Sequence, residues 1–422
     1  MNPKQVFAQG IELMLLLLLV TACAAPKAEP CPTTTPLSCP TSAALQTALT
    51  PTALPTMSLV EVSPSLSELG VEQTLEPTKG IASTLQPSEE ITRDKTHQLT
   101  LLDKLKSHEG DGGFVTSVAF SPTSDILAAG YREGLVKLYD IMTGDLLAEL
   151  DPKLGQVNCI AFNPNGKLIA AGGGRYEFGP SVFGVRIWDV ATHEEVLFLN
   201  DFGETVNAIE FSPNSALLAT VEGNPWGSPD TMKVWDVATG GILSKVDQRS
   251  GLGYYFPDVW RISGIGFNPE GPLLAIAMDI RQVVFLDVRK KTGYKVMIGV
   301  ADYSYGVVFS PDGKRLAVFR SALPDNNSDE DNDLRLWDVT TGQLLIVLEG
   351  YEHGYNSVAF TPNGQVLAAT SEDGTVRRWD LKTREVQAVL EIPGVHSIAL
   401  SPAGTLVATG GDILRLWGVP DH

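Results

Sequence analysis

The sequence predicts an all-β fold made of seven repeats, each a four-stranded antiparallel sheet, behind a long N-terminal segment without a core. Three observations predict it. A Phe-polar-Pro triplet recurs at spacings of 40 to 56 residues, a pair of an aromatic residue and aspartate recurs in step with it, and residues 24–95 contain ten prolines and no aromatic residue. Repeats of 20–50 residues are typical of folds that stack one small unit many times.

Composition limits the classes of partner. The chain has 422 residues, 43% of them hydrophobic, which is enough apolar surface to exclude a wholly disordered protein. Its 31 basic and 50 acidic residues give a formal net charge of −19. Nucleic acids and anionic lipid surfaces attract Lys/Arg patches, so we expect no nucleic-acid partner.

Residues 1–22 are predicted to be a sorting signal. Lys4 precedes a short apolar run at 13–20, which cannot span a hydrocarbon core of about 30 Å. The run ends in Val20-Thr21-Ala22-Cys23, which resembles the lipobox of bacterial lipoproteins. That resemblance implies an exported protein whose only membrane contact is a lipid on Cys23, facing the extracellular or periplasmic space. The alternative is an ordinary secretory signal, with Cys23 incidental; both export the chain.

Residues 23–95 are predicted to be a disordered Pro/Thr-rich linker, because a segment without aromatic residues cannot build a core. Cys31 and Cys39 in this linker could form a disulfide, but free or intermolecular thiols are equally compatible with the sequence. Cys159, between Val157 and Ile160, is expected to be a buried small apolar residue.

The repeats occupy residues 96–422. Each begins with an alternating apolar strand that ends in the triplet, as at Phe120, Phe162, Phe211, Phe267, Phe309, Phe360 and, with leucine in place of phenylalanine, Leu400. A tight turn such as Asn165-Gly166 and a strand of small residues follow. The third strand ends in the aromatic-Asp pair, and a fourth strand completes the unit. Gly172-Gly173-Gly174 is expected to leave its strand and open a flexible loop.

Seven such units with Trp-Asp near the end of the third strand resemble the WD-repeat β-propeller family. The resemblance implies a seven-bladed propeller and gives structural roles to the residues in the aromatic position, which are Tyr139, Trp188, Trp235, Trp337, Trp379 and Trp417. The fourth repeat has Leu286 there, and Gly418 follows Trp417. The family's buried His–Asp–Ser/Thr–Trp network is largely absent, so we expect apolar packing to hold the blades.

The seventh repeat has only three strands. Thr96-His97-Gln98-Leu99 is similar to Thr341-Gly342-Gln343-Leu344, which introduces the fourth strand of the fifth repeat. Residues 96–106 are therefore predicted to supply the missing outer strand of blade seven, and this closure would remove an exposed sheet edge.

No catalytic or cofactor motif accompanies the repeats. The aspartates of the third strands recur with the repeat, which indicates turns, and the histidines form no spaced pair. We therefore predict no enzyme activity and no cofactor. Asp329, Asp331 and Asp333 are a weak calcium candidate, because Leu334 and Thr340 replace the glycine and glutamate that such a loop needs.

The long insertions, 173–184, 222–231, 247–261 and 321–333, all join second to third strands or one blade to the next, so they share one face. The aromatic residues predicted to bind a partner lie there: Tyr176, Phe178, Trp226, Tyr254, Tyr255, Phe256, Trp260, Tyr303 and Tyr305. Because Trp and Tyr dominate binding hot spots, we predict a protein-interaction platform at the cell surface with an unidentified protein partner. The alternatives are a glycan or small ligand bound by the same loops, or aromatic residues that only pack the insertions.

Overall fold

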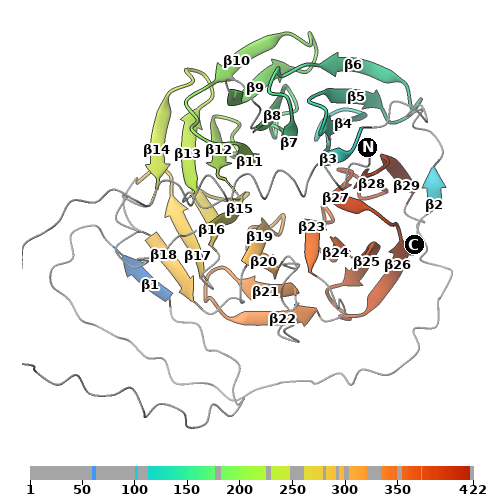
Figure 1. Ribbon diagram of the computed structural model, residues 1–422. Coiled ribbons are helices and arrows are strands. Elements are labelled where there is room, and N and C mark those ends of the chain that lie inside the picture. The colour runs from blue at the N-terminus through green and yellow to red at the C-terminus, as the bar shows by residue number, and fades with distance from the viewer. Residues whose placement is uncertain are drawn as a thin grey trace, which may run out of the picture. The chain divides into compact units, whose positions relative to one another are not determined.

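The computed structural model describes residues 59–62, 100–102, 113–175, 182–224, 230–247, 261–278, 282–290, 294–298, 304–320, 334–348, 354–371 and 373–418. The chain divides into two units, Met1–Ala53 and Leu54–His422, and every described residue belongs to the second. In that unit seven antiparallel sheets surround a common centre (Figure 1). The predicted seven-bladed propeller is confirmed.

The blades follow one another in chain order. Blades one to three are β3 (Val115–Phe120), β4 (Ile126–Tyr131), β5 (Val136–Asp140), β6 (Leu146–Leu150); β7 (Val157–Phe162), β8 (Leu168–Arg175), β9 (Val182–Asp189), β10 (Glu195–Leu199); and β11 (Val206–Phe211), β12 (Leu217–Glu222), β13 (Thr231–Asp236), β14 (Ile242–Val246). Blades four and five are β15 (Ile262–Phe267), β16 (Leu273–Met278), β17 (Gln282–Asp287), β18 (Tyr294–Ile298); and β19 (Ser304–Phe309), β20 (Arg315–Arg320), β21 (Leu334–Asp338), β22 (Leu344–Leu348). Blades six and seven are β23 (Tyr355–Phe360), β24 (Val366–Ser371), β25 (Thr375–Asp380), β26 (Val386–Glu391); and β27 (Val395–Leu400), β28 (Leu406–Gly411), β29 (Arg415–Gly418) with β2 (Thr100–Leu102).

The first strand of each blade lies nearest the centre and the fourth lies at the rim (Figure 1). Burial follows this order: β4 and β12 are buried at all but one position, whereas β6 and β14 each have three exposed residues out of five. Small residues in the second strands, such as Ala128 and Ala129, let neighbouring blades approach closely.

Blade seven is completed by a strand from the other end of the propeller. β2 pairs antiparallel with β29, with Thr100 opposite Gly418, Leu101 opposite Trp417 and Leu102 opposite Leu416. This pairing provides hydrogen-bond partners for the backbone N–H and C=O groups on the outer edge of β29, which would otherwise be unpaired.

A fifth strand lies outside blade four. β1 (Leu59–Val62) pairs antiparallel with β18, and Glu61 stands opposite Lys295. The segment falls within residues 23–95, where the sequence predicted only linker. Its Leu-Val-Glu-Val alternation is short but has strand character, and an open edge such as that of β18 can pair with such a segment.

The core lies between blades rather than within one sheet. In six of the seven blades the third strand has an aromatic residue before its aspartate, and this residue packs on the preceding blade. Trp235 packs with Val185 and Ile187 of blade two, and Trp379 packs with Leu334 and Leu336 of blade five. Two of these tryptophans also donate from Nε1 to a threonine of their own blade, Trp235 to Thr220 (2.9 Å) and Trp417 to Thr409 (3.0 Å).

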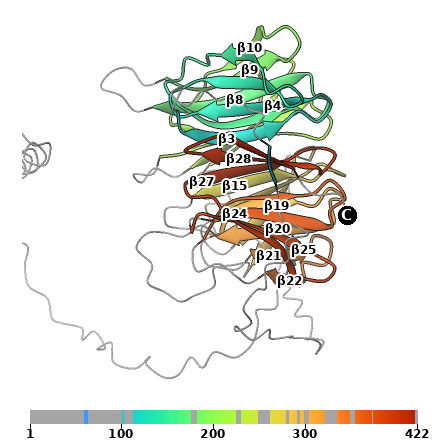
Figure 2. The same cartoon turned by 90° about the vertical axis from the view of Figure 1, so that its right-hand side faces the viewer.

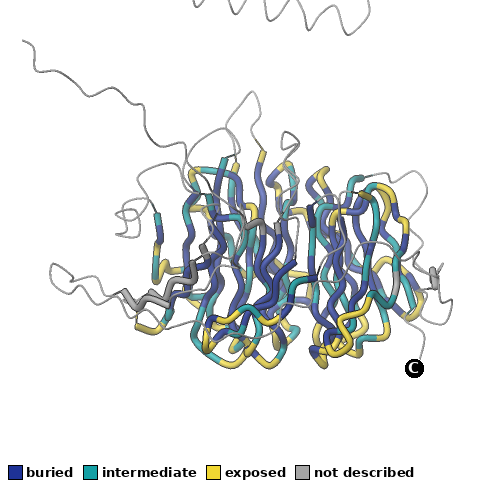
Figure 3. Tube along the Cα trace, turned by 90° about the horizontal axis from the view of Figure 1, so that it is seen from below, coloured by how far each residue is buried: buried dark blue, intermediate teal, exposed yellow. Residues whose placement is uncertain are grey.

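Strand direction creates two faces. We call the face with the first-to-second and third-to-fourth strand connections the turn face, and the face with the other connections the insertion face. Figure 2 shows the ring of blades from the side, and Figure 3, coloured by burial, shows exposed residues gathered mainly along one of its edges. Buried Ser, Asn or Thr residues of the triplet stabilise the turns: Ser212 Oγ accepts the N–H of Leu217 at 2.9 Å, and Thr361 Oγ1 accepts that of Val366 at 3.0 Å.

The glycine run in blade two differs from the prediction. Gly172, Gly173 and Gly174 are not a loop but continue β8, and Gly173 pairs with Gly184 of β9. A Cβ built at Gly173 would stand 2.0 Å from the carbonyl oxygen of Gln156. The glycine is therefore needed for close approach of two strands rather than for flexibility.

No helix among the residues that the structure describes is long and apolar enough to cross a membrane.

Candidate functional site

Most of the aromatic residues predicted to bind a partner lie outside the described residues; these are Tyr176, Phe178, Trp226, Tyr254, Tyr255, Phe256, Trp260 and Tyr303. Tyr305 is the second residue of β19. The calcium candidates Asp329, Asp331 and Asp333 also lie outside the described residues. The predicted binding surface therefore remains a prediction. The structure describes the residues that flank these insertions, and we call them the base of the insertion face.

A buried ion pair lies at this base in blade three. Lys233 Nζ is 2.8 Å from Glu222 Oε1, and both side chains are almost fully buried. Glu222 Oε2 accepts the N–H groups of Gly203 (2.6 Å) and Glu204 (3.2 Å), and Lys233 also donates to the carbonyl oxygen of Asp201. A buried ion pair is tolerated when further hydrogen bonds satisfy both partners. This network fixes the connection from blade two to the end of β12, where an insertion begins.

The far end of that insertion is tied to blade four. Asp230 is buried, and its Oδ2 accepts the N–H of Ile262 at 2.8 Å, at the start of β15. A Cβ built at Gly223 would stand 1.9 Å from Asp230 Oδ1, so glycine leaves the space that the carboxylate occupies. Gly223 and Asp230 therefore hold the two ends of residues 224–229 in place.

Polar side chains also join blades two and three on this face. Asn158 Nδ2 donates to Thr205 Oγ1 (3.0 Å), and Thr205 Oγ1 donates to the carbonyl oxygen of Gly174 (3.0 Å). Within blade three, Asn207 Nδ2 donates to the carbonyl oxygen of Gly223 at 3.1 Å. Together with the bond from the Ile262 N–H to Asp230, the bonds of Asn158 and Thr205 connect blades two, three and four on the insertion face.

The aspartates that end the third strands have a turn-forming role. Asp140 Oδ1 accepts the N–H groups of Met142 and Thr143, each at 2.8 Å. The hydrogen bond from Thr143 is the main reason that the pKa of Asp140 lies below its ordinary value. Asp189 and Asp380 make the same kind of turn, and backbone hydrogen bonds from Thr192 and Thr383 are the main reason that their pKa values are lowered. The pKa of Asp236 is also lowered, first by the hydroxyl of Thr239 and then by its N–H. Carboxylates held in this state accept hydrogen bonds and are poor proton donors.

The thiol of Cys159 is buried, as the sequence predicted. Burial raises its pKa to about 12, and the Sγ donates to the carbonyl oxygen of Gly172 at 3.6 Å. Such a thiol is chemically inert. Within the described residues, no group of three His, Cys, Asp or Glu side chains is placed to hold a metal ion.

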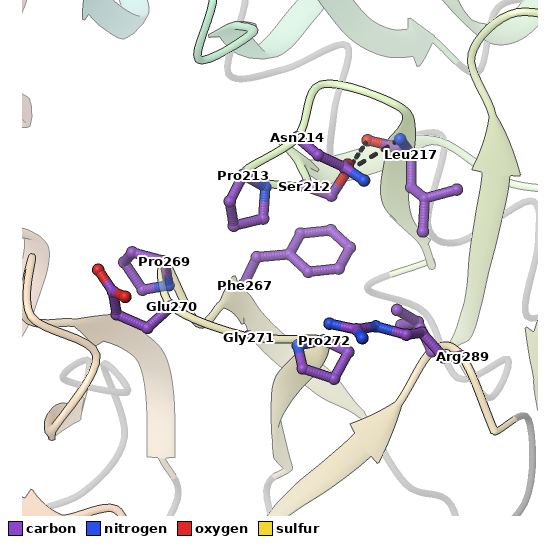
Figure 4. Close-up of a pocket in the computed structure, with 11 residues that line it drawn as sticks. Ser212, Pro213, Asn214, Leu217, Phe267, Pro269, Glu270, Gly271, Pro272 and Arg289 are labelled. Carbon is purple, nitrogen blue, oxygen red and sulfur yellow. Dashed lines mark hydrogen bonds between the residues drawn. The ribbon is translucent and has the colours of Figure 1, made fainter.

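A cavity of about 250 Å³ opens on the turn face between blades three and four (Figure 4). Its walls are mainly apolar. Phe267 forms the buried floor, and prolines at 213, 269 and 272 stand around it. The remaining lining includes Leu217, Val288 and the exposed Arg289.

A half-buried carboxylate contacts the backbone of Phe267, whose side chain lines this cavity. Glu210 Oε1 accepts the N–H of Phe267 at 3.1 Å, so it bridges the first strands of blades three and four. Burial raises the pKa of Glu210 to about 8, and the hydrogen bond from Phe267 opposes this increase. The corresponding residue before the triplet is small or apolar in every other repeat, namely Ala119, Ala161, Gly266, Val308, Ala359 and Ala399.

Our sequence reasoning identified neither the base of the insertion face nor the cavity. Glu210 was detectable, because it is the only acidic residue at its repeat position. Glu222 and Lys233 lie on neighbouring strands, and their pairing depends on register, which the sequence does not state. The cavity depends on how two separate turns meet.

Comparison with known proteins identifies the repeat. The model of the WD domain, G-beta repeat, matches residues 99–140, 144–175 and 342–380. The chain is 22% identical over 297 residues to Periodic tryptophan protein 2 of Saccharomyces cerevisiae, which covers 70% of this chain and 29% of that protein. It is 24% identical over 281 residues to Nuclear distribution protein nudF of Aspergillus niger, covering 63% of this chain and 59% of the other. Nuclear distribution protein PAC1 of Coccidioides posadasii is 26% identical over 312 residues, with 69% and 61% covered. The chain thus spans less than two thirds of each relative.

These relatives correct the predicted location. They are eukaryotic proteins from yeast and other fungi, with a further one from mouse, and two of the three just described are named for nuclear distribution. They point away from an exported lipoprotein, so the predicted location at the outer side of a cell membrane is wrong. That prediction depended on Lys4, the apolar run at 13–20 and the four residues ending at Cys23, all of which lie outside the described residues.

The aromatic-Asp pairs, the matches to the repeat model and the ring of seven four-stranded sheets agree. Three segments of the chain match the WD40 repeat model, and the chain's seven antiparallel sheets form a seven-bladed β-propeller.

Proposed function

We propose that this propeller is a non-catalytic protein-interaction scaffold, and that its partner binds the insertion face over blades two to four. WD40 propellers are generally scaffolds that bind proteins, which supports the proposal at the level of the fold. The placement depends on one observation: buried polar contacts fix both ends of an insertion, through Glu222 and Lys233 at one side and Asp230 at the other.

A fixed base matters because loops that bind a partner lose conformational entropy in doing so. The hydrogen bonds from Thr205 to Gly174 and from the Ile262 N–H to Asp230 restrict where the loops can start and end before any partner arrives. Pre-organisation of this kind lowers the cost of association. The loops themselves contain Trp226 and Trp260, the two tryptophans outside the aromatic repeat position.

The test compares variants of the full chain in binding to a captured partner. Partners are isolated by affinity capture, identified by mass spectrometry and titrated against purified protein. Trp260→Ala and Tyr255→Ala should each weaken binding at least about tenfold, or about 1.4 kcal/mol. Lys382→Ala, at an exposed turn on the opposite face, is the control and should leave the affinity unchanged.

Two outcomes would contradict the proposal. If Lys382→Ala weakens binding and the aromatic variants do not, the partner binds the turn face. If a glycan array yields a ligand whose binding requires Trp260 and no protein partner depends on it, the insertion face binds carbohydrate.

A further inference from the structure

The turns of neighbouring blades touch at most seams of the turn face, and glycine marks the contact. A Cβ built at Gly166 would stand 1.9 Å from Thr123 Oγ1 of the preceding blade, and one at Gly313 would stand 2.3 Å from Asn268 Oδ1. For Gly364 the nearest atom is Arg315 Nη2 at 3.1 Å. At Gly271, the same turn position in blade four, a Cβ would meet nothing within 4 Å. The seam between blades three and four is therefore open.

Hydrogen bonds across the seams show the same difference. The Asn165 N–H donates to Ser215 Oγ, between blades two and three, at 3.3 Å. Asn268 Nδ2 donates to the carbonyl oxygen of Gly313 at 2.9 Å, and Arg315 Nη2 donates to that of Gly364 at 2.6 Å. In blade three, the Ser212 hydroxyl bonds to Asn214 and Leu217 of its own turn. The bond that does cross this seam, from the Phe267 N–H to Glu210 Oε1, joins the first strands of the two blades rather than their turns.

The open seam is the cavity of about 250 Å³ already described. Pockets that enclose a whole small molecule are usually about 300–1,000 Å³, so this one is better suited to a single large side chain. Phe267 and the surrounding prolines offer apolar, rigid walls (Figure 4). Anchors of protein interfaces are aromatic or aliphatic side chains that fill such pockets.

The positive charge of Arg289 at the edge of the cavity indicates which residue type should accompany the inserted apolar side chain. The Arg289 side chain extends over the cavity near Gly271, whereas the Glu270 carboxylate lies beyond Pro269 and away from Phe267 (Figure 4). Arg289 is exposed, and no carboxylate among the described residues forms an ion pair with it. A guanidinium in this position favours a carboxylate, which it can bind with two parallel hydrogen bonds.

We propose that the seam between blades three and four is a second docking site, which binds a peptide segment of a partner protein. The segment inserts one large apolar side chain over Phe267 and places a neighbouring Asp or Glu carboxylate on Arg289. The site is on the turn face, so it is separate from the insertion face and gives the propeller two opposed binding surfaces.

The test uses phage-displayed random short peptides selected on the full chain, followed by titration of one synthetic peptide from each enriched group. We expect a group with an aromatic or aliphatic residue close to Asp or Glu. Arg289→Glu should weaken its binding at least tenfold. Gly271→Leu should do the same by filling the cavity; Gly271 has no positive φ, so a side chain is tolerated there.

The matched control is Lys382→Glu, which makes the same charge change at the equivalent position of the blade-six turn. It should leave the affinity unchanged, as should Trp260→Ala on the insertion face. Thermal unfolding of each variant establishes that the fold is intact. The proposal is overturned if no such group is enriched, or if the enriched peptides bind Arg289→Glu and Gly271→Leu as tightly as the unaltered chain.

Discussion

Arg378 should destabilise the propeller, and its replacement by leucine should make the protein more stable. The residue lies on β25 one position before Trp379, where the other blades have Leu138, Ile187, Val234, Phe285, Leu336 and Leu416, all at most 1% exposed. Arg378 is 3% exposed, and its Nε and Nη1 atoms have no hydrogen-bond partner. Burial lowers the pKa of its guanidinium.

The expected magnitude follows from these two unsatisfied donors. Each buried unsatisfied donor costs about 1–3 kcal/mol. Ala368, opposite Arg378 on β24, belongs to the apolar cluster between blades six and seven, so a leucine would join existing apolar packing. Leucine is shorter than arginine and leaves some space, which offsets part of the gain. We expect Arg378→Leu to raise the free energy of unfolding by about 1–3 kcal/mol.

Urea unfolding followed by tryptophan fluorescence measures this change as a higher midpoint with an unchanged slope. Two controls separate the effect from general changes in charge. Lys382→Leu removes a cation from an exposed turn and should change stability by less than about 0.5 kcal/mol. Leu336→Arg creates the same defect in blade five and should destabilise the protein. If Arg378→Leu lowers the midpoint while Leu336→Arg leaves it unchanged, the reasoning about buried unsatisfied donors is refuted here.

Two further predictions concern buried polar groups. Val318→Thr should stabilise the protein by about 1 kcal/mol. In blade three, Thr220 accepts a hydrogen bond from Trp235 Nε1, whereas Trp337 Nε1 of blade five has no acceptor and Val318 occupies the position of Thr220. A lower thermal midpoint for this variant would contradict the prediction. Glu210→Gln should remove a pH dependence. The pKa of Glu210 is about 8 in the fold and about 4.3 in the unfolded chain, so between these values only the unfolded state loses the proton and stability falls as pH rises. Unfolding midpoints of the two proteins should match near pH 4, below the pKa of the unfolded chain, and favour the glutamine variant near pH 8; an equal pH profile for both would show that Glu210 titrates normally.

The repeat could be predicted from sequence because it depends on local chemistry. Alternation of apolar residues marks the strands, and the aspartate after each aromatic residue marks a turn that its own carboxylate stabilises, as Asp140 does through Met142 and Thr143. Such signals lie within a few residues of one another. The prediction of a loop at residues 172–174 was wrong for the same reason. Gly173 pairs with Gly184 of a different strand, and this contact cannot be read from the residues next to Gly173.

The candidate sites depend on contacts between residues that are far apart in the sequence, and local sequence patterns do not reveal such contacts. Glu222 and Lys233 look like ordinary charged residues until register places them 2.8 Å apart. The open seam at Gly271 resembles the closed seams at Gly166 and Gly313 in sequence, and only the distances between turns distinguish them. Both candidate sites therefore lie where one blade departs from its neighbours.

The pairing of β2 with β29 sets an order of events during synthesis on the ribosome. Thr100–Leu102 emerges before any blade exists, and its partner Arg415–Gly418 emerges after all the others. Until then the apolar surface of blade one, including Val115 and Leu127, lacks its contact with Leu416. A chain without β29 would therefore leave apolar surface of blade one and the pairing edge of β28 exposed, and such surfaces favour aggregation.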